Sequence, residues 1–399
     1  MISAFNKERI SLGIHKLFTD LKSLQLNQSE LKILIFCLVA LIVAKGSSLL
    51  PLTYDTDDYY FSIIPIIDET RGLIWVLGHG RFGSLIIYNF LISLGIYPTY
   101  VNIFAGFLSI LSLVWMGIII CRLWGINNNI LLGSLVVSMI TLHPYTVGIF
   151  TYKILTYTIY FNFFLAFLGL YLIRSNVVGF LVGTILIIFS ISDYQLIVNF
   201  LFLTICISFT ITLLNNYGNR PFKLKEVLKN SKEILQIFAL SLCAFLYFII
   251  NLIVQTFAKS PMVARGRLIG FGDIPTKLNE VKDIIIRVFF ENEPIFPQAT
   301  KIILLYIIFI AIFSVVIRII GRKDTIQSKV LLLALTLVLI GASIIGIVGI
   351  TIPLQMSWTT PRFLSSSGIF LGGLLAIGYS GLGGKLKTIL LIFAFPVLF

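Results

Sequence analysis

The chain alternates long apolar runs with short polar segments. Runs such as Ile302 to Ile317 and Val330 to Ile352 are continuous, whereas the strands of a membrane barrel alternate apolar and polar positions. About ten runs approach ~20 residues, the length of helix that crosses ~30 Å of hydrocarbon. The pattern therefore predicts an all-α, polytopic transmembrane protein with about 10–11 spans.

The runs also predict where each helix lies. Spans are expected at 31–52, 100–122, 129–147, 151–173, 177–191, 194–214, 233–256, 301–320, 330–352 and 364–381, with one more from about Thr388. The stretch from Ser84 to Tyr97 is shorter than a span and contains Asn89, so we expect an amphipathic helix on the membrane surface. Charged and apolar residues alternate at helical spacing from Lys277 to Glu291, which predicts a second surface helix.

Composition and charge narrow the class of protein. With 58% hydrophobic residues, 12% charged residues and a mean hydropathy of +1.01, a soluble fold is excluded. The net charge of +13 comes from basic residues scattered between apolar runs, so no nucleic-acid-binding face is expected. The four cysteines show no metal-ligand spacing and are expected to be small core residues: Cys37, Cys121, Cys206 and Cys243.

The basic segment from Arg220 to Lys232 fixes the predicted orientation. The positive-inside rule places this loop in the cytoplasm, and counting spans in both directions leaves the N-terminus there too. Residues 1–30 are then a cytoplasmic amphipathic segment, and 31–399 form one transmembrane domain. Its two long outer loops are 53–99 and 257–300.

The first outer loop holds the strongest candidate chemistry. Asp55, Asp57 and Asp58 follow directly after the first span, together with Tyr54. A carboxylate here could act as a general base, although Thr56 or Asp57 could equally cap the surface helix that follows. The same cluster could ligate Mg²⁺ or Mn²⁺, but we expect no metal and no other cofactor, because no second acidic cluster lies at a matching depth.

Basic residues in the same loop could hold a phosphate. Arg71 precedes a glycine-rich segment, Gly78 to Gly83, in which His79 and Arg81 are exposed by a sharp turn. The alternative is an ordinary turn in which Arg81 reaches lipid head groups. The topology brings further polar and aromatic residues to this predicted outer face: His143, Lys153, Tyr194, Gln195, Trp358 and Arg362. Such residues suit a sugar and a phosphate, but an interfacial aromatic belt would also contain the tyrosines and Trp358.

These elements together resemble the polytopic Gtr-type glucosyltransferases, often phage-encoded, that add glucose to O-antigen, and more broadly the GT-C superfamily. The matching elements are the Asp57-Asp58 pair after a single span, Gly80-Arg81 some 20 residues later, Tyr194-Gln195 at the start of a mid-chain span, and the late Pro361-Arg362. One departure is Phe61, where the family often has a basic residue after the aspartate pair. Arg71 and Arg81 are the candidate replacements for that cation.

The resemblance implies a GT-C-like fold and a membrane glycosyltransferase of the bacterial inner membrane. Its donor would be a polyprenyl-phosphate hexose such as undecaprenyl-phosphate glucose, and its acceptor a lipid-linked or surface polysaccharide (O-antigen) on the periplasmic face. Asp57 or Asp58 would be the base, with Asp58 slightly favoured. The donor phosphate would meet Arg81, Arg71, His79, Lys153 and Arg362, and the sugar would meet Tyr194, Gln195, Tyr54 and Trp358.

Two other classes of protein share these substrates. A lipid-linked saccharide flippase or transporter would usually show charges near mid-bilayer and repeated halves, whereas here the ionisable residues collect at one face and no repeat is evident. An O-antigen polymerase or ligase typically relies on arginines and a histidine in a large later loop. Arg265, Arg267 and Arg287 in the second outer loop keep that alternative open.

Overall fold

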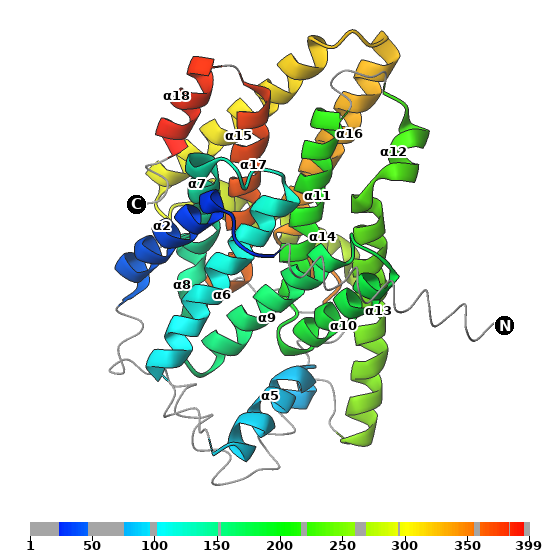
Figure 1. The fold of residues 1–399 in the computed structure, drawn as a ribbon. Helices are drawn as coiled ribbons and strands as arrows, with labels where there is room; N and C mark the ends of the chain where they lie inside the picture. Colours follow the sequence, from blue (N-terminus) through cyan, green and yellow to red (C-terminus); the bar gives the residue numbers. More distant parts are fainter. Residues whose placement is uncertain are drawn as a thin grey trace, which may run out of the picture.

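The protein is described from a computed structural model of residues 1–399. The structure describes residues 24–46, 76–95, 102–150, 153–216, 222–259, 269–293, 296–354, 360–382 and 384–394. Within these ranges the regular elements are helices and no sheet is formed (Figure 1). The all-α polytopic fold predicted from the sequence is confirmed.

Most helices lie on predicted spans. The α-helices are α2 (Gln28–Lys45), α5 (Phe82–Ser93), α6 (Asn102–Leu123), α7 (Ile130–Thr141), α8 (Val147–Phe150), α9 (Lys153–Leu172), α10 (Val177–Asp193), α11 (Ile197–Asn216), α12 (Leu224–Asn230), α13 (Lys232–Phe257), α14 (Ile274–Phe289), α15 (Gln298–Ile320), α16 (Ile326–Gly346), α17 (Ser367–Gly381) and α18 (Gly384–Ala394). Four 3-10 helices complete the description: η3 (Pro144–Thr146), η5 (Phe271–Asp273), η6 (Gly349–Thr351) and η7 (Pro361–Leu364).

Six of the described helices are long and apolar enough to cross a membrane, and one bent pair would make a seventh. The bent pair corrects the continuous span expected at 129–147. There α7 ends at Thr141 and the chain turns by 46° into η3 and α8. Pro144 has no amide hydrogen to continue the helix and disfavours the helical conformation of the residue before it, His143.

Both helices predicted for the membrane surface are present. The first is α5, whose 12 residues extend only about 18 Å at 1.5 Å per residue, too short to cross the hydrocarbon. It lies at one end of the molecule, with α18 at the other (Figure 1). The second is α14, which buries Val281, Ile284 and Val288 along one face. Their position at a membrane surface stays a prediction.

The core is centred on α11 and α17. About 83% of the apolar stretch of each is buried, compared with 22% for α13, so α11 and α17 are interior and α13 is peripheral. An apolar outer surface is expected where helices face lipid. Small residues allow the close packing inside: a Cβ on Gly373 of α17 would meet Ile207 of α11 at 2.1 Å.

Buried ion pairs fasten the end of the bundle that lies at the start of α10. Arg122 of α6 binds Glu30 of α2 with Nε and Oε1 2.6 Å apart. Arg174, just before α10, binds Glu233 of α13, and the hydroxyls of Ser208, Thr212 and Ser231 also donate to that carboxylate. We call this the Arg174 end of the bundle, and the end at Asp193, the last residue of α10, the Arg81 end.

Removing Glu233, which is buried, should destabilise the protein strongly, because the largely buried Arg174 would be left without its counter-charge. We expect Glu233→Ala to cost about 3–5 kcal/mol and to lower the melting temperature in detergent. Glu226→Ala is the matched control, because Glu226 and Lys223 form an exposed pair at the start of α12. Equal melting temperatures for the two variants would show that the pair of Arg174 and Glu233 does not stabilise the protein more than the exposed pair does.

Candidate active site

A tight turn leads into α5 at the Arg81 end. Gly80 has a left-handed backbone with φ of +73°, which favours glycine. Gln195 Nε2 donates to the His79 carbonyl at 2.9 Å, and Tyr247 Oη of α13 donates to the Gly80 carbonyl at 3.0 Å. A second glycine, Gly83, brings the start of α5 against the end of α10, where an added Cβ would come within 3.0 Å of the Asp193 backbone nitrogen. The turn is therefore held by helices far away in the sequence.

Arg81 follows this turn and lies over the ring of Tyr194, with Cζ 5.2 Å from the ring centroid. Its side chain is partly buried, its Nε has no hydrogen-bond partner, and no described residue accepts a hydrogen bond from the guanidinium. Burial lowers the pKa of Arg81, nearby Tyr194 and Asp193 oppose that shift, and the charge of Arg362 lowers it further. An arginine remains charged under such conditions, so Arg81 presents a cation with donors to spare.

Arg362 supplies a second cation from η7. Its guanidinium lies over the ring of Phe363 at 5.8 Å, and that ring is 6.5 Å from the ring of Tyr194. The two arginines therefore lie over neighbouring aromatic rings. At Arg81, the cation–π contact holds the guanidinium in place without using its hydrogen-bond donors. This pair of arginines is suited to a phosphate.

Asp193 is the buried carboxylate closest in sequence to Tyr194, and it is 2% exposed. Ser84 Oγ of α5 donates to its Oδ1 at 2.5 Å, and Asn162 Nδ2 of α9 donates to its Oδ2 at 2.8 Å. It acts electrostatically on Arg81, but no ion pair joins the two among the described residues. Burial raises the pKa of Asp193, while the hydrogen bonds from Ser84 and Asn162 and the charge of Arg81 oppose that shift. Both oxygens accept hydrogen bonds, an arrangement that suits the negatively charged carboxylate beside the arginines.

A second cluster of charges lies around Glu293, between α14 and α15. Tyr145 Oη and Arg287 Nε both donate to this carboxylate, and Lys301 Nζ lies 3.8 Å from its Oε2. Burial raises the pKa of Glu293, but the hydrogen bonds and the two cations outweigh that effect, so the pKa is lowered overall. The cluster ties the start of α15 to η3, which in turn packs on η7 and so supports Arg362.

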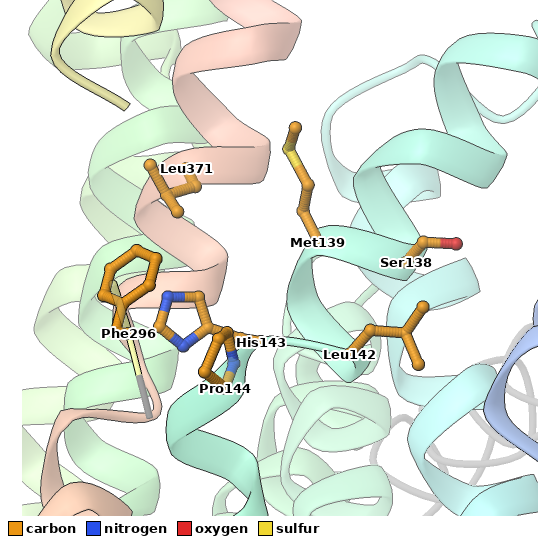
Figure 2. A pocket seen from close by; sticks show the side chains of 7 residues that line it. All are labelled: Ser138, Met139, Leu142, His143, Pro144, Phe296 and Leu371. Atoms are coloured by element: carbon orange, nitrogen blue, oxygen red, sulfur yellow. The ribbon is translucent and has the colours of Figure 1, made fainter. Parts of the chain in front are cut away.

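A narrow pocket lies beside this cluster where α7 ends (Figure 2). His143 lies between the apolar side chains of the pocket, with its ring 5.2 Å from that of Phe296. Its Nδ1 accepts the Tyr145 amide hydrogen at 3.2 Å, and its Nε2 is 3.2 Å from Ser367 Oγ. Both ring nitrogens are thus occupied, which identifies His143 as a buried link between α7, η3 and α17.

The structure brings several of the predicted site residues to one end of the bundle. Arg81, Tyr194 and Arg362 form one cluster, while His79 and Gln195 meet through a backbone hydrogen bond. Lys153 begins α9, and its side chain is not described. The remaining predicted site residues lie outside the described residues: Asp57, Asp58, Arg71, Tyr54 and Trp358.

No metal site is assembled from the described part of the chain. No three His, Cys, Asp or Glu side chains there come together as ligands. Asp55, like the aspartates after it, lies outside the described residues. The four cysteines are buried and none forms a disulfide.

Sequence reasoning did not select Asp193 or Glu293 as site residues. The signal for Asp193 is visible in retrospect, since it is a carboxylate at the very end of an apolar run and directly before Tyr194. An ionisable residue at that position needs a partner. Glu293 lies in a polar loop with Arg287 six positions before it, but its contact with Tyr145, 148 positions away, has no local signal.

Comparison with known protein families identifies the family to which the chain belongs. The family model described as glucosyl transferase GtrII matches residues 46–372. The chain belongs to the GtrII glucosyltransferase family. The matched range includes Asp57 and Asp58 of the first loop, and also Arg81 and Arg362. No curated protein and no solved structure matches the chain.

The glycine turn of this GtrII glucosyltransferase offers a direct test of the site. A Cβ on Gly80 would meet Tyr247 Oη at 2.4 Å, so Gly80→Ala should displace Arg81 and lower glucosyl transfer by roughly 10- to 100-fold. Gly125→Ala is the matched control, because Gly125 has φ of +70° but nothing within 4 Å of an added Cβ. The expected loss is specific to Gly80, and equal transfer rates in steady-state assays of the two variants would refute it.

Proposed function

We propose that this GtrII glucosyltransferase moves a glucosyl or other hexosyl group from a polyprenyl-phosphate donor. The acceptor would be a lipid-linked or surface polysaccharide (O-antigen) at the outer face of the bacterial inner membrane. The observation that carries the proposal is Arg81, a partly buried cation held over Tyr194 with no hydrogen bond to any described residue. An anionic ligand would use those donors, and Arg362 on the next ring adds a second charge.

The chemistry of this end of the bundle supports the proposed donor class. Arg81 lies directly before α5, whose exposed side chains Ile86 and Phe90 form an apolar face. A polyprenyl-phosphate sugar has the matching parts, since its phosphate would meet the arginines and its chain would lie along apolar surface. A nucleotide-sugar donor would need a soluble binding domain, and the described helices and loops form none.

The reaction needs one base and one group that stabilises the leaving phosphate. The acceptor hydroxyl oxygen attacks the anomeric carbon, and the bond from that carbon to the phosphate oxygen breaks. The hydroxyl proton passes to a carboxylate, and the phosphate leaves as an anion beside Arg81. Because the leaving group is already a stable anion, no general acid is required.

Asp57 or Asp58 is proposed as the base, with Asp58 slightly favoured. Two carboxylates described at the Arg81 end, the buried Asp193 and the partly buried Glu293, support this choice, because both are already engaged. Asp193 accepts from Ser84 and Asn162, and Glu293 accepts from Tyr145 and Arg287. The first-loop aspartates are therefore the better candidates for a carboxylate that meets the acceptor.

The decisive experiment is transfer with purified components. The protein in lipid nanodiscs would be supplied with polyprenyl-phosphate [¹⁴C]glucose and an O-antigen acceptor, and label in the polysaccharide would be counted. Transfer of single labelled glucosyl residues is the expected result. Movement of intact donor across vesicles without transfer would support a flippase instead, and joining of whole oligosaccharide units would support a polymerase or ligase.

A further inference from the structure

We propose that Asp193 is a specificity-determining residue that weakens binding of the spent carrier, a polyprenyl phosphate, relative to the loaded donor. This inference rests on the proposed function and adds a role for a residue outside the predicted site. The donor is a phosphodiester with one negative charge, whereas the released carrier is a phosphomonoester with about 1.5–2 negative charges at pH 7. A fixed negative charge at the phosphate site distinguishes the two.

The placement of Asp193 is the first support. It directly precedes Tyr194, the residue on whose ring Arg81 lies, and its carboxylate acts on the Arg81 charge without forming an ion pair. Ser84 and Asn162 hold the carboxylate from two different helices. Asp193 therefore contributes charge at this site while leaving the donors of Arg81 available to a ligand.

The charge count gives the second support. Among the described side chains grouped around Tyr194, Arg81 and Arg362 contribute two positive charges and Asp193 one negative charge. Coulomb energy scales with the charge of the ligand, so Asp193 repels the monoester nearly twice as strongly as the diester. Without this repulsion, two arginines would hold the product more tightly than the substrate, and release of the carrier would slow turnover.

The site can accept a neutral replacement. In Asp193→Asn, the new amide can still accept from Ser84 through its oxygen. Its nitrogen would face Asn162, whose Oδ1 is buried and has no hydrogen-bond partner. If the Asn162 amide flips, its Oδ1 can accept a hydrogen bond from the nitrogen of the new side-chain amide. The number of hydrogen bonds is then preserved, and the variant changes mainly the charge.

The test compares two ligands on the full-length protein in nanodiscs. Polyprenyl phosphate and polyprenyl-phosphate glucose would each displace a fluorescent polyprenyl phosphate from wild type and from Asp193→Asn. We expect the Kd of the monoester to fall about 10-fold and that of the diester about 3-fold, because the effect on the logarithm of Kd follows ligand charge. Inhibition of transfer by added polyprenyl phosphate should strengthen in parallel.

Two controls separate charge from structure. Ser84→Ala removes a hydrogen bond to Asp193 but leaves the carboxyl group in place, so the ratio of the two Kd values should change much less than in Asp193→Asn. Asp283→Asn removes one negative charge from an exposed position on α14 and should also leave the ratio unchanged. If Asp193→Asn does not fold, Asp193→Ser removes the same charge and serves in its place.

The outcomes are distinct. The role of Asp193 would be overturned if Asp193→Asn left the ratio of the two Kd values unchanged or bound the monoester more weakly than wild type. It would also be overturned if Ser84→Ala changed that ratio as much as Asp193→Asn does. In each of these cases, glucosyl transfer by wild type would still support the proposed function. If wild type binds neither lipid and transfers no glucose from this donor, the proposed function fails and this inference fails with it.

Discussion

Replacing Asp58 with asparagine is expected to lower the turnover of glucosyl transfer by roughly 10²–10⁴-fold. The substitution keeps the size of the side chain and much of its hydrogen bonding, but an amide cannot take the acceptor's proton. Donor binding should be nearly unchanged, because the phosphate is assigned to Arg81. The measurement is kcat in the nanodisc assay together with the Kd of the donor.

Asp57→Asn is the internal control for this assignment. The two aspartates are neighbours, so a loss confined to Asp57→Asn would move the role of base by one residue and leave the mechanism unchanged. Near-full transfer in both variants, with normal expression and folding, would show that the first loop is not the catalytic centre.

The helices could be predicted from the sequence because the bilayer imposes a simple rule. Each span must satisfy its own backbone hydrogen bonds and present apolar side chains, so an apolar run of sufficient length marks a helix. The run from Lys232 to Phe257 therefore coincides with α13. The break after Thr141 was missed because hydropathy treats Pro144 as one residue among many, whereas its missing amide hydrogen ends the helix.

The candidate site could be predicted only where its chemistry is local. Gly80 and Arg81 are adjacent, and together they indicate a turn with an exposed cation. The partners that hold them come from α10 to α13, and Tyr247 is 167 positions from Gly80. Such pairings depend on how helices pack, and no local pattern records them. For the same reason, no local pattern places Asp193 between Ser84 and Asn162.

Removing the Arg81 side chain should weaken binding of the donor more than it slows chemistry at saturation. In Arg81→Ala the phosphate loses a charge-assisted contact worth about 1.5–3 kcal/mol, so the Kd of the donor should rise roughly 10- to 150-fold. Arg81→Lys should fall between wild type and alanine, because lysine keeps the charge but loses the planar guanidinium that stacks on Tyr194. The measurement is donor titration in the nanodisc assay, which separates Kd from kcat.

Lys229→Ala is the matched control for Arg81→Ala, because it also removes one cation. Lys229 is exposed on α12, and the basic segment containing it is expected to set topology only. Its loss should leave donor binding unchanged. If Arg81→Ala bound the donor as tightly as Lys229→Ala, the guanidinium over Tyr194 would not be the phosphate ligand, and Arg362 would become the candidate to test. A large rise in Kd for Arg81→Ala alone, with kcat retained within about 10-fold, would separate the cation that binds the donor from the carboxylate that removes the proton.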